Sequence, residues 1–251
     1  MPKYAVCDKN WIPDIGSLES AIGPSTRAVI INSPNNPTGV IYPESSIAEI
    51  CQTIRKAEET YGTQIYLISD EPYRKLIYTD APYPFIFNHH PRSIVATSHS
   101  KDLGLAGERI GYIAVNPNDP DKTDLLDALN FSLRTLGFVN APALMQRVVA
   151  GIQQATVDIN IYRAKRDLLF KSLKKIGYEC VEPDGAFYLF PKTPISDDEH
   201  FVAQLQKRLV LVVPGIGFGT PGFFRASYCV DDWVIEGAIH GLEEAFNQAN
   251  S

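Results

Sequence analysis

Residues 28–39 read AVIINSPNNPTG, a short β-branched run that leads directly into a turn rich in Asn and Pro. Two more apolar runs, at 65–68 and 94–97, lead in the same way into the polar stretches SDEPY at 69–73 and SHSK at 98–101. Short runs of this kind, bounded by turn residues, predict buried β-strands. Polar side chains at the ends of such strands are candidates for a binding site, because open α/β sheets bind ligands there.

The segments around these runs predict the rest of a large α/β domain. Apolar residues recur at helical spacing over 47–61, and Gly62 is a typical residue just past a helix end. Residues 110–115 form a fourth apolar run. Strands that alternate with helices predict a mostly parallel sheet covered by helices.

The character of the chain changes after a long helix predicted at 161–176. Residues 178–181 and 186–190 are expected to form a hairpin. Ser196 and Glu199 have the spacing of a capping box, which predicts that a helix begins there. We therefore expect a small α+β domain at the carboxyl end.

The predicted organisation is two domains. Residues 1–150 would form a partial large α/β domain with the start of a connecting helix, and residues 151–251 the connecting helix with the small domain. The length of 251 residues is sufficient for a buried core.

Composition excludes several classes of function. The formal charge of −6, with no basic block, argues against a nucleic-acid partner. No apolar run approaches the roughly 20 residues that span a bilayer, so no membrane partner is expected. The amino terminus has no signal-peptide pattern, and the four cysteines lack metal or redox spacing, which favours the cytoplasm. The histidines lack a second ligand cluster, so no metal site is predicted.

The polar residues after the three strands form a chemical set. Asn36 supplies an amide, Asp70 and Tyr73 a carboxylate and a phenol, and Ser98 and Lys101 a hydroxyl and an amine. A lysine near a carboxylate and a phenol suggests imine chemistry, in which a lowered pKa makes the amine a nucleophile. These demands fit pyridoxal phosphate, with the lysine as Schiff-base group and an acidic group on the ring nitrogen.

Four ordered motifs carry a resemblance to a known family. They are NSPNNPTG at 32–39, DEPY at 70–73, SHSK at 98–101 followed by GERIGY at 107–112, and FRAS at 224–227. The sequence resembles the class I/II aminotransferases, the aspartate aminotransferase-like branch of the fold-type I pyridoxal-phosphate enzymes. The resemblance covers essentially the whole chain and implies a homodimer with active sites at the subunit interface.

The resemblance also implies roles for residues of the cofactor site. Lys101 would form the Schiff base and shuttle the proton, and Asp70 would pair with the pyridine nitrogen. Tyr73 and Asn36 would bind the 3′ oxygen.

Further roles concern the phosphate and the substrate. Ser98 and Arg109 would bind the cofactor phosphate. Arg225 would bind the substrate carboxylate, and Asn36 is a second candidate for binding the substrate. The expected activity is the transfer of an amino group from an amino acid to a 2-oxo acid.

The sequence departs from the family pattern at its start, because the motif with Asn36 arrives after only 35 residues. The part that supplies a phosphate-binding turn and a ring-stacking residue is therefore expected to be lacking. This departure motivates one alternative, a truncated remnant without catalytic competence. A second alternative is a lyase or decarboxylase with the same cofactor and fold.

Overall fold

The computed structural model describes residues 1–80 and 82–250, which form two compact units. Unit 1 comprises Met1–Ser33, Tyr42–Lys75 and Asp80–Val157; unit 2 comprises Pro34–Ile41, Leu76–Thr79 and Asp158–Ser251. Each unit is thus assembled from three separate stretches of chain. Among the described residues, no helix is long and apolar enough to cross a membrane.

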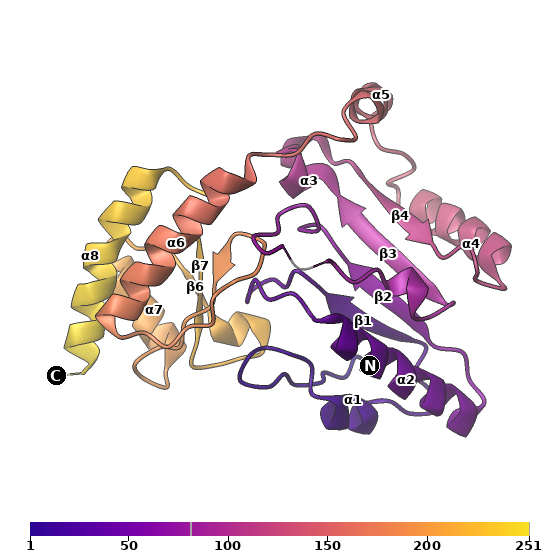
Figure 1. Ribbon diagram of the computed structural model, residues 1–251, viewed down its shortest axis with the longest axis horizontal. Coiled ribbons are helices and arrows are strands. Elements are labelled where there is room, and N and C mark those ends of the chain that lie inside the picture. Colours follow the sequence, from indigo (N-terminus) through magenta and orange to yellow (C-terminus); the bar gives the residue numbers. More distant parts are fainter. Residues whose placement is uncertain (81, 251) are drawn as a thin grey trace. The chain divides into compact units, whose positions relative to one another are not determined.

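Unit 1 is built on a four-stranded sheet with the order β1-β2-β3-β4 (Figure 1). The strands are β1 (Ala28–Asn32), β2 (Tyr66–Asp70), β3 (Ser93–Ser98) and β4 (Gly111–Val115). β1, β2 and β3 run parallel, and β4 is antiparallel to β3. The prediction of a mostly parallel α/β sheet is confirmed.

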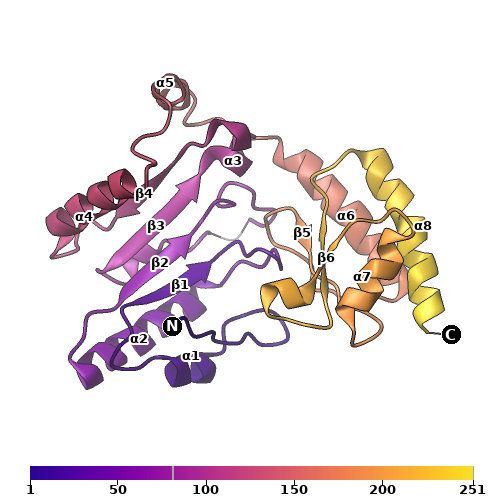
Figure 2. The same cartoon turned by 180° about the vertical axis from the view of Figure 1, so that it is seen from behind.

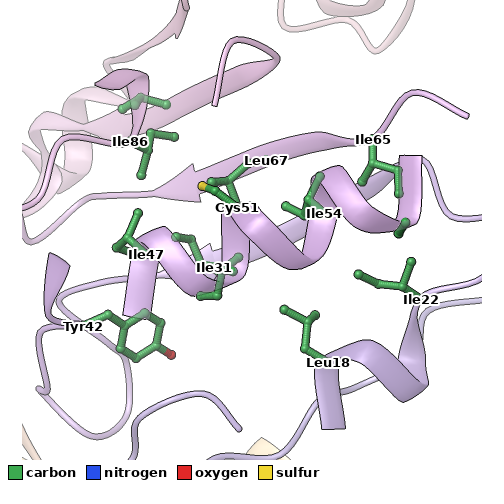
Figure 3. Close-up of a cluster of buried hydrophobic side chains, with 13 residues drawn as sticks. Leu18, Ile22, Ile31, Tyr42, Ile47, Cys51, Ile54, Ile65, Leu67 and Ile86 are labelled. Atoms are coloured by element: carbon green, nitrogen blue, oxygen red, sulfur yellow. The ribbon is translucent and has the colours of Figure 1, made fainter. Parts of the chain in front are cut away.

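Helices α1 (Ile15–Ala21) and α2 (Glu44–Tyr61) pack on one face of this sheet (Figure 3). As predicted, α2 ends at Gly62, whose φ of 62° lies in the left-handed region that glycine adopts without steric cost. The buried cluster includes Leu18, Ile22, Ile31, Ile47, Ile50, Cys51, Ile54, Ile65, Leu67 and Val95. Burial of this many aliphatic side chains is the main stabilising contribution to unit 1.

The opposite face of the sheet bears exposed apolar residues. Ile30 is 70% exposed and Ile113 44% exposed. Strand register places Asp70, Ala96 and Ile113 in one row on this face, and Ser98 lies on the same face two residues along β3. After β4 come α4 (Lys122–Thr135), which contains no buried residue, and α5 (Ala143–Gly151). The short helix α3 (His99–Asp102) lies between β3 and β4 in the chain.

Unit 2 contains an antiparallel sheet with the order β5-β7-β6 and three helices (Figure 2). Its elements are α6 (Ile159–Ile176), β5 (Tyr188–Leu189), α7 (Asp198–Gln206), β6 (Val213–Pro214), β7 (Phe224–Ser227) and α8 (Asp232–Ala249). Tyr178 lies in its core, where the ring packs against Phe224 and Phe246 and the hydroxyl donates to the Leu242 carbonyl. The predicted small α+β domain is confirmed as a fold class.

The loop of residues 34–41 is an integral part of unit 2. The carbonyl oxygen of Gly39 accepts hydrogen bonds from the amides of Asp184 and Gly185, at 3.0 and 2.9 Å. Gly39 has a φ of 73°, and a Cβ at this position would lie 2.5 Å from Cβ of Pro183. Only glycine therefore fits this close approach between two distant parts of the chain.

Two local predictions in unit 2 are wrong. Residues 178–181 form no strand, because the turn after them pairs elsewhere: the Tyr78 amide donates to the Asp184 carbonyl, and Ile77 bridges to Gly185. The predicted capping box is also not used. Asp197 caps α7 by accepting a hydrogen bond from the His200 amide at 2.8 Å, since aspartate caps a helix as well as serine does.

Candidate functional site

The carboxyl ends of the parallel strands bring polar residues together in unit 1. Asn32 ends β1 and is in register with Asp70, which ends β2. The Asn32 side-chain amide donates to Oδ2 of Asp70 at 3.0 Å and to its carbonyl oxygen at 2.9 Å. The sequence prediction gave Asn32 no role. Its place at the end of the neighbouring strand was the signal that could have assigned one.

Asp70 is an exposed residue whose carboxyl group is nonetheless partly desolvated. This desolvation raises the pKa of the Asp70 carboxyl above its ordinary value. The adjacent residue in the row is Ala96, whose side chain is a single methyl group. A cationic nitrogen placed here would favour the charged carboxylate and reverse the shift.

Lys101 lies in α3, a single helical turn that follows β3 directly. Ser98 occupies the position before this turn, and its hydroxyl makes no capping hydrogen bond. Both side chains are half-buried. A hydroxyl donor and a primary amine are thus three residues apart at the carboxyl end of β3.

Arg109 is exposed and adopts a φ of 53°, a left-handed conformation that is uncommon for a residue other than glycine. Its Nη1 donates to the Ala106 carbonyl at 2.9 Å. Such backbone conformations cost on the order of 1–3 kcal/mol and cluster at functional sites. Tyr73, in the turn after β2, is by contrast buried.

Glu71, next to Asp70, is a second residue that the sequence prediction left without a role. Its side chain is fully buried, and within the described part of the chain neither carboxylate oxygen is hydrogen-bonded. Burial raises the pKa of this carboxyl, and the positive charge of Arg74 opposes the shift.

We expect Glu71→Gln to reduce the dependence of stability on pH. Because the folded-state pKa of Glu71 is raised, folding takes up a proton between the unfolded and folded pKa values, so the free energy of unfolding falls as pH rises through that window. Glutamine has no such proton. The lost ion pair to Arg74, 3.8 Å long and half-exposed at the arginine, contributes little.

Thermal unfolding from acid to neutral pH tests this expectation, with the exposed Glu59→Gln as the control. The variant at Glu71 should melt higher than the parent at neutral pH, and the difference should shrink toward acid. Parallel pH profiles for parent and variant would contradict it.

In unit 2 the structure brings Arg225 and Asn36 together. Arg225 lies on β7, and its guanidinium carbon is 4.6 Å from the Tyr188 ring centroid and 4.8 Å from that of Phe218. Its Nη1 donates to Oδ1 of Asn36 at 2.9 Å. Contacts with two aromatic rings and an amide oxygen orient the guanidinium plane.

The donor set of unit 1 fits pyridoxal phosphate. Lys101 offers an amine for an aldehyde, and Asp70 a desolvated carboxylate for a ring nitrogen. Ser98 offers a hydroxyl without a capping bond, and the exposed Arg109 offers a guanidinium for a phosphate. The described residues contain no group of three or more His, Cys, Asp or Glu that could hold a metal ion.

Comparison with known proteins decides the family. The family model described as "Aminotransferase class I and II" matches residues 2–242. This chain belongs to that family. Members of the aminotransferase family use pyridoxal phosphate, in agreement with the donor set of unit 1.

Individual relatives agree with this assignment. A probable aspartate aminotransferase of Methanocaldococcus jannaschii is 32% identical over 95% of this chain and 64% of its own length. The crystal structure of an amino transferase from Eubacterium rectale has a TM-score of 0.95 and 40% identity over 98% of this chain and 62% of that one. The aspartate aminotransferase of Thermotoga maritima has a TM-score of 0.83 at 28% identity, with 95% and 61% covered. The chain thus spans less than two thirds of the length of these relatives.

Proposed function

We propose that this chain functions as a pyridoxal-phosphate-dependent aminotransferase, which moves an amino group between an amino acid and a 2-oxo acid. One observation carries the proposal. Asp70 and Ser98 share one face of the sheet at the carboxyl ends of their strands, and the turn with Lys101 follows directly. Pyridoxal phosphate, when bound, supplies an aldehyde that an amine can attack and a ring that accepts electrons.

The residues of unit 1 would hold this cofactor and move a proton. Lys101 Nζ would bind the aldehyde carbon covalently with loss of water. Once the substrate amine had displaced it, the freed Lys101 amine would carry the proton to and from the substrate Cα. The Asp70 carboxylate, oriented by Asn32, would keep the ring nitrogen protonated. The Tyr73 hydroxyl would donate to the 3′ oxygen.

The anionic ends of the cofactor and the substrate call for cationic partners. Ser98 Oγ and the Arg109 guanidinium would bind the phosphate. In unit 2, Arg225 would bind the substrate carboxylate, since its planar fork matches two oxygens, and Asn36 would orient that fork.

A product assay with a panel of amino acids and a 2-oxo acid acceptor tests the proposed reaction. Formation of the 2-oxo acid of the donor, together with the amino acid of the acceptor, supports transamination. Release of ammonia or carbon dioxide without a new amino acid would instead identify a lyase or a decarboxylase. The variant Lys101→Ala serves as the blank for reactions of the free cofactor.

A second candidate is a module that has the family fold and lacks catalytic competence by itself. Exposed apolar residues on the sheet face, such as Ile30, together with the uncovered side chains of α4, favour it. A shift of the melting temperature with pyridoxal phosphate separates the two candidates, because only a specific binder is stabilised by mass action. Sedimentation would test whether the chain forms the proposed homodimer. The proposed compartment is the cytoplasm, which the four free thiols support.

A further inference from the structure

The helical turn that carries Lys101 also contains a buried carboxylate with contacts to distant residues. The residue after Lys101, Asp102, has a side chain only 8% exposed, and Oδ2 lies 3.2 Å from His99 Nδ1 and 3.5 Å from Lys75 Nζ. The other carboxylate oxygen is buried, with no hydrogen-bond partner within the residues described. A buried carboxylate is costly unless it is paired. The contacts with His99 and Lys75 therefore restrict where the Asp102 side chain can lie.

The backbone of Asp102 is also engaged. Its carbonyl oxygen accepts hydrogen bonds from the Val157 amide at 2.7 Å and from Thr156 Oγ1 at 3.2 Å. Lys75 Nζ in turn donates to the carbonyl oxygen of Gln153 at 2.9 Å. Asp102 is therefore held through both its side chain and its main chain by segments distant in sequence.

These two segments have a common position in the chain. Lys75 and Val157 are each the last residue of a stretch of unit 1, and at the next residue the chain passes into unit 2. An isolated helical turn such as α3 has little stability of its own, because one turn forms too few hydrogen bonds to offset its ordering. The contacts of Asp102 supply the missing support.

We propose that Asp102 is a positioning residue for Lys101. It fixes the helical turn that carries the amine to Lys75 and Val157, two of the three residues at which the chain passes from unit 1 into unit 2. The inference rests on the proposed function only in so far as Lys101 is the reactive amine. Loss of the Asp102 carboxylate leaves Lys75 and His99 without their common partner. The turn then loosens together with residues 153–157, and the amine is no longer held in one place.

Amide hydrogen exchange of the full chain without cofactor is the first measurement. In Asp102→Asn, exchange in 99–105 and 153–157 should become about tenfold faster, while the core strands β2 and β3 keep their protection. Lys75→Met should give the same pattern of faster exchange. Lys75→Arg, which keeps the positive charge, should exchange like the parent. The matched control is Asp119→Asn, another buried aspartate, which lies beyond the other end of β4.

Covalent labelling gives the second measurement. After incubation with pyridoxal phosphate and reduction with borohydride, Asp102→Asn should carry about tenfold less label on Lys101 than the parent or Asp119→Asn. Unchanged exchange and labelling in Asp102→Asn, or equal changes in both aspartate variants, would overturn the proposal. A parent chain that takes no label on Lys101 would instead contradict the proposed function, and the exchange data would still decide the role of Asp102.

Discussion

Replacement of Lys101 by alanine should abolish specific capture of pyridoxal phosphate by this chain. None of the other side chains that we assign to the site is a primary amine, and only an amine can form a reducible bond with the aldehyde carbon. Removal of the covalent nucleophile should lower any transamination rate by about 10⁴-fold or more, on the scale seen when enzymes lose such a group. The fold of unit 1 should be retained, because Lys101 is half-buried at the end of the sheet and lies outside its core.

The measurement is mass spectrometry of the borohydride-reduced chain after digestion. A single pyridoxyl group on the peptide with Lys101 is expected in the parent, and none on the variant. The control is Lys171→Ala, which removes a lysine whose side chain is 75% exposed in α6. Scattered labelling of surface lysines in the parent, at the same level in Lys101→Ala, would refute the assignment of the reactive amine.

Replacement of Arg225 by lysine should impair binding of the substrate and leave capture of the cofactor intact. Lysine keeps the charge but loses the planar fork, the hydrogen bond to Asn36 and the contacts with Tyr188 and Phe218. With each hydrogen bond to a charged group contributing about 1.5–3 kcal/mol, kcat/KM for the amino acid should fall by about 100-fold or more.

Steady-state kinetics with an amino acid donor and a 2-oxo acid acceptor measure this effect, and borohydride labelling of Lys101 serves as the internal check. The control is Arg208→Lys, at a guanidinium that pairs with Glu244 and Gln248 and has no assigned role in the site. A normal KM in Arg225→Lys would exclude Arg225 as the carboxylate partner. Loss of label as well as of substrate binding would show that Arg225 acts through the fold.

The parts of the fold that local signals specify could be predicted from the sequence. Apolar spacing and Gly62 predicted α2, and the short β-branched runs predicted three strands within two residues. The family motifs named the candidate residues of the site, whose roles stay predictions. Asp70 and Ser98 do share one sheet face, as the register of parallel strands requires.

The remaining features depend on partners far away in the chain. The expected hairpin at 178–190 failed because residues 76–78 compete for the same backbone groups. The contacts of Asp102 with Lys75 and Val157 could not be predicted, since nothing in the local sequence marks which distant segments meet at a buried carboxylate. The hydrogen bond between Asn36 and Arg225 likewise joins residues that are 189 positions apart in the chain.

The discontinuous make-up of unit 2 bears on how the protein is synthesised and cut. Residues 34–41 leave the ribosome long before Asp184 and Gly185, whose amides bind the Gly39 carbonyl. Unit 2 can therefore complete its fold only late in translation, after a long-range closure of the kind that slows folding. A protease that cuts between Val157 and Asp158 would not release unit 2 whole, because the carboxyl-terminal fragment would leave Asn36 behind.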